Sequence, residues 1–146
     1  VVMTSCAALT AILSAEQAAV GAIYVIGAVM WLAGFAIEVI ADQQKSRFRA
    51  DPANAARFIN VGLWARSRHP NYFGEILLWA GIAAMAIPYL SGTQWVVMLS
   101  PFFVYGLLTR ISGIPTLVRR GQERWGNEPA YQAYVANTPR LLPRLR

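Results

Sequence analysis

The chain has 146 residues, of which 56% are hydrophobic and 14% are charged. Soluble domains carry about 25% charged residues, so this balance disfavours a soluble domain and favours a single domain in a lipid bilayer. The net charge of +6 comes without a nucleic-acid-binding motif, and the one cysteine supports neither a disulfide framework nor a zinc site. We therefore expect neither nucleic acid nor a metal ion as a partner.

The chain begins with an apolar stretch, residues 1–13, that is too short to span a membrane and lacks the basic start of a signal peptide. We expect it to be the end of a truncated helix, and the chain to be part of a larger membrane protein. Three later stretches approach the roughly 20 apolar residues that a transmembrane helix needs, and Pro88 and Pro101 predict bends in the last two. These stretches are residues 18–41, 73–90 and 94–111, with Glu38, Glu75 and Arg110 as their only charges.

The basic residues predict the topology. All 13 Lys and Arg residues lie between Lys45 and Arg68 or from Arg110 onward, and the turn at residues 91–93 has none. Three spans place both basic segments on one side, which the positive-inside rule makes cytoplasmic. The predicted fold is an all-α, multi-pass transmembrane helix bundle. It has three full spans, a partial N-terminal span and a cytoplasmic amphipathic C-terminal tail, and it forms one membrane domain over residues 1–146.

A stripe of charged residues marks the end of the first span. Glu38, Asp42, Lys45 and Arg49 are spaced by 4, 3 and 4 residues, which places them on one face of a helix that continues out of the membrane. Two interpretations remain open. The stripe is either an interfacial helix end with charge pairs and snorkelling cations, or one wall of a ligand site with carboxylates deep in the bundle and cations at its mouth.

The start of the second span supplies an opposite wall. Pro70 predicts the first turn of a helix, and the N–H groups of that turn, next to Arg68 and His69, favour a phosphate. Asn71 and Glu75 lie one turn apart and point to the same side. A histidine is also ordinary at a membrane interface. Together with a carboxylate just inside the bilayer, however, these residues indicate a functional site.

The chain ends in a basic, aromatic tail. Arg110 closes the third span, and the Ser-Gly-Ile-Pro sequence at residues 112–115 predicts a helix break. The tail from residue 119 to 146 is amphipathic. It either lies on the membrane surface or forms a lid that adds Arg and Tyr side chains to a bound nucleotide. Its aromatic residues include Trp125, Tyr131 and Tyr134.

Several of these segments resemble one family of membrane proteins. The chain contains Gly62-Leu63-Trp64 followed by Ser67-Arg68-His69-Pro70-Asn71-Tyr72-Phe73-Gly74-Glu75. This pattern resembles the signature of the steroid 5-alpha-reductase-like family (the DUF1295 group), which shares the core of Δ14-sterol reductases. The resemblance extends over residues 30–143. Its flanking parts are residues 34–38, 42–49, 112–115, 124–126, 131–134 and 141–143.

The resemblance implies a membrane oxidoreductase that uses NADPH to reduce a carbon–carbon double bond of a lipid or steroid-like enone. It implies a hydrophobic small-molecule substrate, and it assigns the chain to the C-terminal, cofactor-binding part of a larger reductase. The proton-donating acid is expected in the preceding helices, so no catalytic residue is assigned here. With the phosphate-binding residues predicted above, the expected NADPH-binding set is Glu38, Asp42, Lys45, Arg49, Arg68, His69, Asn71, Tyr72, Glu75 and Arg110.

Two alternatives remain open. The isoprenylcysteine and phospholipid methyltransferases, which use S-adenosylmethionine, have a similar Arg-His-Pro-x-Tyr-x-Gly core, which this chain contains at residues 68–74. A membrane protein that binds a nucleotide without catalysis is the second alternative. Asn71 and the charged stripe from Asp42 to Arg49 favour the reductase, because a nicotinamide dinucleotide needs partners for its amide and its phosphates.

Overall fold

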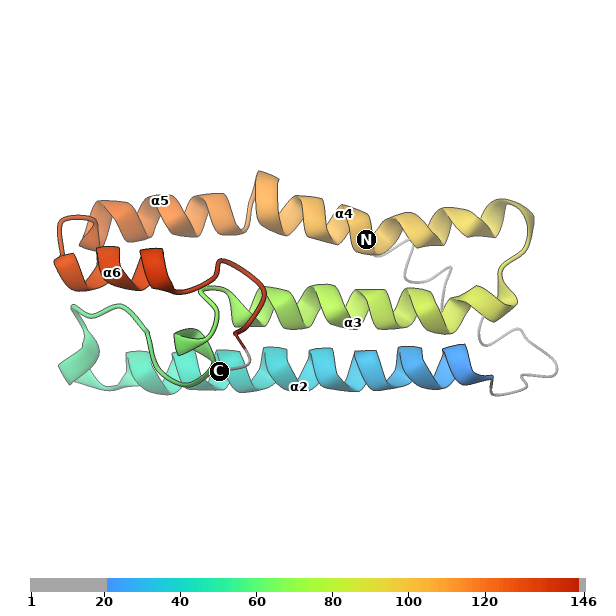
Figure 1. Ribbon diagram of the computed structural model, residues 1–146, viewed down its shortest axis with the longest axis horizontal. Coiled ribbons are helices and arrows are strands. Elements are labelled where there is room, and N and C mark those ends of the chain that lie inside the picture. Colours follow the sequence, from blue (N-terminus) through green and yellow to red (C-terminus); the bar gives the residue numbers. More distant parts are fainter. Residues whose placement is uncertain (1–20, 145–146) are drawn as a thin grey trace.

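The computed structural model describes residues 21–144, which form helices and loops without any β-strand. Three long helical rods lie side by side, with α3 in the middle (Figure 1). This confirms the predicted all-α bundle. The elements are α2 (Ala22–Ala50), η1 (Pro52–Asn54), η2 (Gly62–Ala65), α3 (Pro70–Ala86), η3 (Ile87–Tyr89), η4 (Gly92–Leu99), α4 (Ser100–Gly106), the π-helical turn η5 (Leu107–Ile111), α5 (Ile114–Trp125) and α6 (Pro129–Asn137).

Three helical segments are long and apolar enough to cross a membrane: Ala22–Ala50, Pro70–Tyr89 and Gly92–Trp125. Their number agrees with the three predicted spans, whereas the predicted partial N-terminal helix falls outside the described residues. Helix α2 continues nine residues beyond the predicted end of the span at residue 41, up to Ala50, which confirms the predicted extension of this helix out of the membrane. This extension is rich in Gln, Lys and Arg, which are good helix formers, and the next proline is Pro52.

Helices α2 and α3 are antiparallel and pack through pairs of glycines. A Cβ atom added to Gly34 would lie 2.6 Å from the carbonyl oxygen of Gly74, and one added to Gly27 would lie 2.7 Å from that of Gly81. The glycines are seven residues apart on each helix, so both pairs fall on one contact line. Glycines at such positions let two backbones approach closely, as is common between helices in membranes.

The second and third rods are irregular near the prolines that predict bends. Pro88 lies in the 3-10 turn η3 that ends the rod of α3. In the third rod, η4 adopts 3-10 geometry just before Pro101, which occupies the first turn of α4. Proline has no N–H to donate and clashes with the preceding turn. The predicted break at residues 112–115 is confirmed, because the π-helical turn η5 ends there and α5 starts at Ile114.

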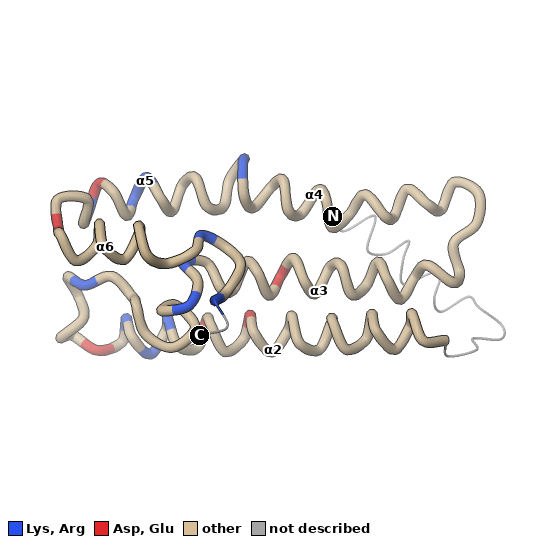
Figure 2. Tube along the Cα trace, in the orientation of Figure 1, with Lys and Arg blue, Asp and Glu red and all other residues tan. Residues whose placement is uncertain are grey.

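The charged residues gather at one end of the bundle. Figure 2 shows Lys, Arg, Asp and Glu along the half that holds α5, α6 and the end of α2, while the other half is free of them in the part of the chain that is drawn in colour. Both basic segments therefore lie at the same end, as three spans require. The cytoplasmic orientation of this charged end stays a prediction.

Candidate functional site

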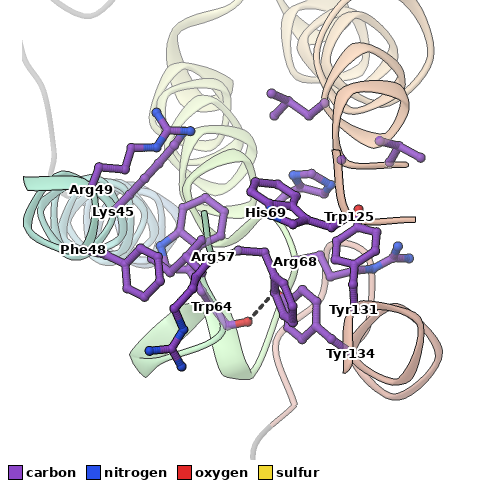
Figure 3. A pocket seen from close by; sticks show the side chains of 15 residues that line it. Lys45, Phe48, Arg49, Arg57, Trp64, Arg68, His69, Trp125, Tyr131 and Tyr134 are labelled. Carbon is purple, nitrogen blue, oxygen red and sulfur yellow. Dashed lines mark hydrogen bonds between the residues drawn. The ribbon is translucent and has the colours of Figure 1, made fainter. Parts of the chain in front are cut away.

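A pocket opens at the charged end, between the last turns of α2, the loop of residues 51–69, α5 and α6 (Figure 3). It encloses about 770 Å³ of space outside the protein atoms, part of it open to solvent.

The loop of residues 51–69 is held against α2 by hydrogen bonds. The indole Nε1 of Trp64 donates to the backbone oxygen of Ala41 (3.0 Å), and the backbone N–H of Leu63 donates to Oε1 of Gln44 (2.9 Å). Gly62 has φ +59 and lies directly under the Gln44 side chain, where a Cβ atom would collide with it. Glycine adopts this backbone conformation without a steric cost. These contacts place Trp64 in the wall of the pocket.

The C-terminal segment is tied to the start of α3. Ser67, which is fully buried, donates from Oγ to the backbone oxygen of Leu141 (2.8 Å). The backbone N–H of Arg68 donates to the oxygen of Pro139 (2.9 Å). The hydroxyl of Tyr134 on α6 donates to the backbone oxygen of Trp64 (2.7 Å), the bond that is drawn dashed in Figure 3. The end of the chain is thereby folded back over the pocket.

Aromatic side chains form the wall on the side of α5 and α6. The ring of Phe58 lies 5.2–6.2 Å from the rings of Trp125, Tyr131 and Tyr134, measured between centroids. Burial raises the pKa of Tyr134 to about 12, so its hydroxyl stays protonated as a hydrogen-bond donor. Trp125, Tyr131 and Tyr134 of the tail line the pocket. This agrees with the lid interpretation, whereas a bound nucleotide beneath the lid stays a prediction.

Four cationic side chains line the pocket: Lys45, Arg49, Arg57 and Arg68. Within the described chain, no carboxylate is among the lining residues. Lys45 Nζ lies 5.4 Å from the centre of the Trp64 ring, within the range of a cation–π contact. Nε of Arg68 is buried without a hydrogen-bond partner among the described residues. A buried donor that lacks a partner is costly unless a bound group satisfies it.

His69 lies in the same pocket and is 7% exposed. Burial, followed by the charges of Arg68, Arg140 and Lys45, lowers the pKa of His69 to about 4. The imidazole is therefore neutral at physiological pH, with one nitrogen donating and the other accepting. Nδ1 is buried and has no partner in the described structure. His69 thus presents a neutral hydrogen-bonding group beside the cations.

The structure divides the ten predicted cofactor-binding residues into groups. Four of them line the pocket: Lys45, Arg49, Arg68 and His69. Tyr72 adjoins the pocket, because its ring stacks on that of His69 with centroids 5.8 Å apart and planes 15° apart. Arg110 is exposed on the turn η5 and is not among the lining residues.

The remaining four predicted residues lie along the contact of α2 and α3, a group that we call the seam cluster: Glu38, Asp42, Asn71 and Glu75. Nδ2 of Asn71 donates to Oδ1 of Asp42 (3.2 Å). Tyr72 connects the two groups, because it follows Asn71 in the chain and its ring stacks on that of His69. The seam cluster therefore continues from the pocket but does not line it.

Sequence reasoning did not identify Arg57 and Phe58 as site residues, although both line the pocket. They belong to a loop without helical periodicity, so the only sequence signal for them was that one side chain is basic and the other aromatic. Phe48 and Gly121 were also missed. Gly121 is buried beneath Tyr131, whose hydroxyl occupies the place of a Cβ atom. No local sequence pattern predicts such a contact.

Comparison with known proteins gives one match. The family model described as "Protein of unknown function (DUF1295)" matches residues 1–138, which is most of the chain. No curated protein and no solved structure matches it. The resemblance noted in the sequence is confirmed at the level of the family, whereas the reductase activity and the cofactor stay predictions. The chain belongs to the DUF1295 family.

Proposed function

We propose that the chain binds NADPH in the pocket at its charged end, as part of a membrane reductase that acts on the carbon–carbon double bond of a lipid or steroid-like enone. The match to DUF1295, together with the resemblance of residues 62–75 to steroid 5-alpha-reductase-like proteins, supports this class of reaction. When bound, NADPH supplies the hydride for such a reduction.

The observation that carries the proposal is the composition of the pocket. Four cations and no carboxylate line it, alongside aromatic rings. The phosphates of NADPH accept charge-assisted hydrogen bonds from Arg and Lys, and the purine and nicotinamide rings stack on aromatic side chains. S-adenosylmethionine carries a sulfonium and an ammonium group, which the same four cations would repel. The pocket thus fits a polyanionic nucleotide better than the methyl donor.

Each group of residues has a distinct proposed role. Arg68 and His69 line the pocket and each has a buried nitrogen atom without a partner among the described residues. They are proposed to contact a phosphate or the amide of the cofactor. Lys45, Arg49 and Arg57 hold the remaining phosphate charge. The aromatic side chains of α5 and α6 cover the nucleotide and exclude water, which strengthens these electrostatic contacts.

The seam cluster is proposed to receive the amide end of the cofactor. Oδ1 of Asn71 is buried without a partner among the described residues, so it is available to accept a hydrogen bond from a carboxamide. The stack of Tyr72 on His69 places the cluster next to the pocket. Replacing Asn71 with Asp would remove the amide donor to Asp42 and add a repelling charge, and we expect it to weaken NADPH binding.

Thermal unfolding of the purified protein in detergent tests the proposal. NADPH at about 100 times its Kd stabilises a folded protein by about 2.7 kcal/mol, so a clear rise in Tm is expected. S-adenosylmethionine at the same concentration should give a smaller rise. A larger rise with the methyl donor would support the methyltransferase alternative, and no rise with NADPH would reject the proposed cofactor.

A further inference from the structure

A second hollow lies outside the pocket, as a groove between α3 and the rod of η4 and α4. It consists of two adjoining parts that share Ile76 and Tyr105. The part farther from the charged end is walled by small residues of α3, among them Ala80 and Ala84, and by Phe102, which is 72% exposed. None of the residues that line the groove lines the candidate cofactor pocket.

The groove is longer than the hydrocarbon part of one lipid leaflet. Along α3 and η3 it extends from Phe73 to Ile87, a rise of about 21 Å at 1.5 Å per residue. The hydrocarbon core of a bilayer is about 30 Å thick, so one leaflet contributes about 15 Å. The groove is therefore long enough for an acyl chain that enters from the leaflet at the charged end.

The end of the groove near α5 is basic. Arg140 lines it, and its Nη2 donates to the backbone oxygen of Thr109 (2.8 Å), which fixes the guanidinium beside the apolar wall. Arg144 follows four residues later in the chain, and its backbone N–H donates to the oxygen of Arg66 (3.0 Å). Within residues 21–144 the structure has one salt bridge, Arg119 with Glu123, so no carboxylate neutralises these arginines there.

We propose that an anionic phospholipid binds in this groove, with an acyl chain between α3 and α4 and its phosphate against Arg140. An apolar groove that ends at Arg140, which has no carboxylate partner among the described residues, complements a molecule with an apolar chain and an anionic head. The positive-inside rule places this end on the cytoplasmic side, where anionic lipids attract basic groups. This lipid site is separate from the proposed cofactor site and does not depend on it.

Native mass spectrometry of the full chain in detergent tests the proposal by titration with phosphatidylglycerol and phosphatidylcholine of identical acyl chains. Phosphatidylglycerol should bind at least about fivefold more tightly, which is about the effect of one basic group on an anionic lipid. Arg140→Gln should remove this preference and Arg140→Lys should retain most of it. Arg120→Gln is the control for net charge, because Arg120 is exposed on α5 outside the groove, and it should leave the preference intact.

A second variant tests the apolar part. Ala84→Phe places a bulky ring in the groove and should weaken the binding of both lipids by a similar factor. The helical circular dichroism spectrum checks that the variant is folded. Equal binding of the two lipids to the wild type would overturn the proposal. An equal loss of the preference for phosphatidylglycerol in Arg120→Gln and Arg140→Gln would also overturn the proposal. Binding of glycerol 3-phosphate as tight as that of the intact lipid would overturn it as well.

Discussion

The two halves of the bundle are built from different interactions. In the apolar half, α2 and α3 meet at Gly27 and Gly81 and their outer faces are apolar, with Leu32 58% exposed. At the charged end, side chains hold the backbone of distant segments, as in the bond from Tyr134 to Trp64. The apolar half therefore depends on close backbone packing, while the charged end depends on a few specific hydrogen bonds around a pocket.

This difference separates stability from binding. Filling a glycine contact should destabilise the whole protein, because the two backbones cannot move apart without losing their shared contact line. Changing a pocket side chain should alter ligand affinity or the position of the lid and leave the bundle folded. The predictions below test this separation, beginning with the largest expected effect.

Gly34→Leu should destabilise the bundle most. A Cβ atom at this position lies 2.5 Å from the backbone nitrogen of Leu78 and 2.6 Å from the oxygen of Gly74, so α2 and α3 must separate. We expect a loss of at least about 3 kcal/mol, at the upper end of overpacking costs, measured by reversible unfolding in detergent. Gly106→Leu is the matched control, since a Cβ atom there meets nothing within 4 Å. Equal losses in the two variants would contradict the packing account.

Acidic pH should destabilise the charged end through His69. Its pKa is about 4 in the folded protein, against an ordinary value of 6.5. The unfolded chain therefore binds the proton more readily, and stability falls as the pH drops from about 6.5 to about 4. The loss is at most about 3 kcal/mol, from 1.36 kcal/mol per pH unit.

The pH effect of His69 is isolated by comparison with a variant. Unfolding free energies of the wild type and of His69→Gln should be measured at several pH values across this window, because the carboxylates common to both proteins also titrate there. The difference between the two proteins should shrink as the pH falls. A difference that is independent of pH would show that the imidazole is not held neutral by burial.

Arg49→Ala should weaken NADPH binding by about 1–3 kcal/mol, the usual worth of a hydrogen bond to a charged group. Both side chains are exposed, but Arg49 lines the pocket and Arg110 does not. We therefore expect a smaller loss for Arg110→Ala, both measured by isothermal titration in detergent. Equal losses would extend the cofactor site to the π-helical turn η5, and unchanged affinity in both would remove the phosphate assignment.

Tyr134→Phe should have the smallest effect. It removes the hydrogen bond to the backbone oxygen of Trp64, which is worth about 1 kcal/mol. The aromatic packing against Phe58 is retained. We expect faster backbone hydrogen exchange in α6 and little change in the Tm of the bundle. An unaltered exchange rate in α6 would mean that this bond does not hold the lid.

The sequence was a good guide to the spans. Hydropathy and the basic residues predicted three of them with both basic segments at one end, and Pro70 predicted the start of α3 because proline favours the first helical turn. The site was predicted only in part. Lys45 and Arg49 share a helical face with Glu38 and Asp42, yet different segments pack opposite them. The loop with Trp64 faces Lys45, whereas Asn71 at the start of α3 contacts Asp42.

The lid could not be placed from local patterns. Its position depends on bonds between residues about 70 positions apart, such as Ser67 with Leu141 and Trp64 with Tyr134. Periodicity and capping signals report contacts within a few residues. The aromatic residues of the tail were visible in the sequence, but their side of the bundle depended on these distant contacts.

Hydrogen–deuterium exchange with and without NADPH tests the central claim most directly, because it locates the bound cofactor. The account predicts slower exchange in the loop at residues 62–69 and in α6, which contribute lining residues, and no change in the turn at residues 91–93 at the opposite end. S-adenosylmethionine should give weaker protection of the same segments. Unchanged exchange around the pocket at saturating NADPH, or protection confined to the opposite end, would contradict the account.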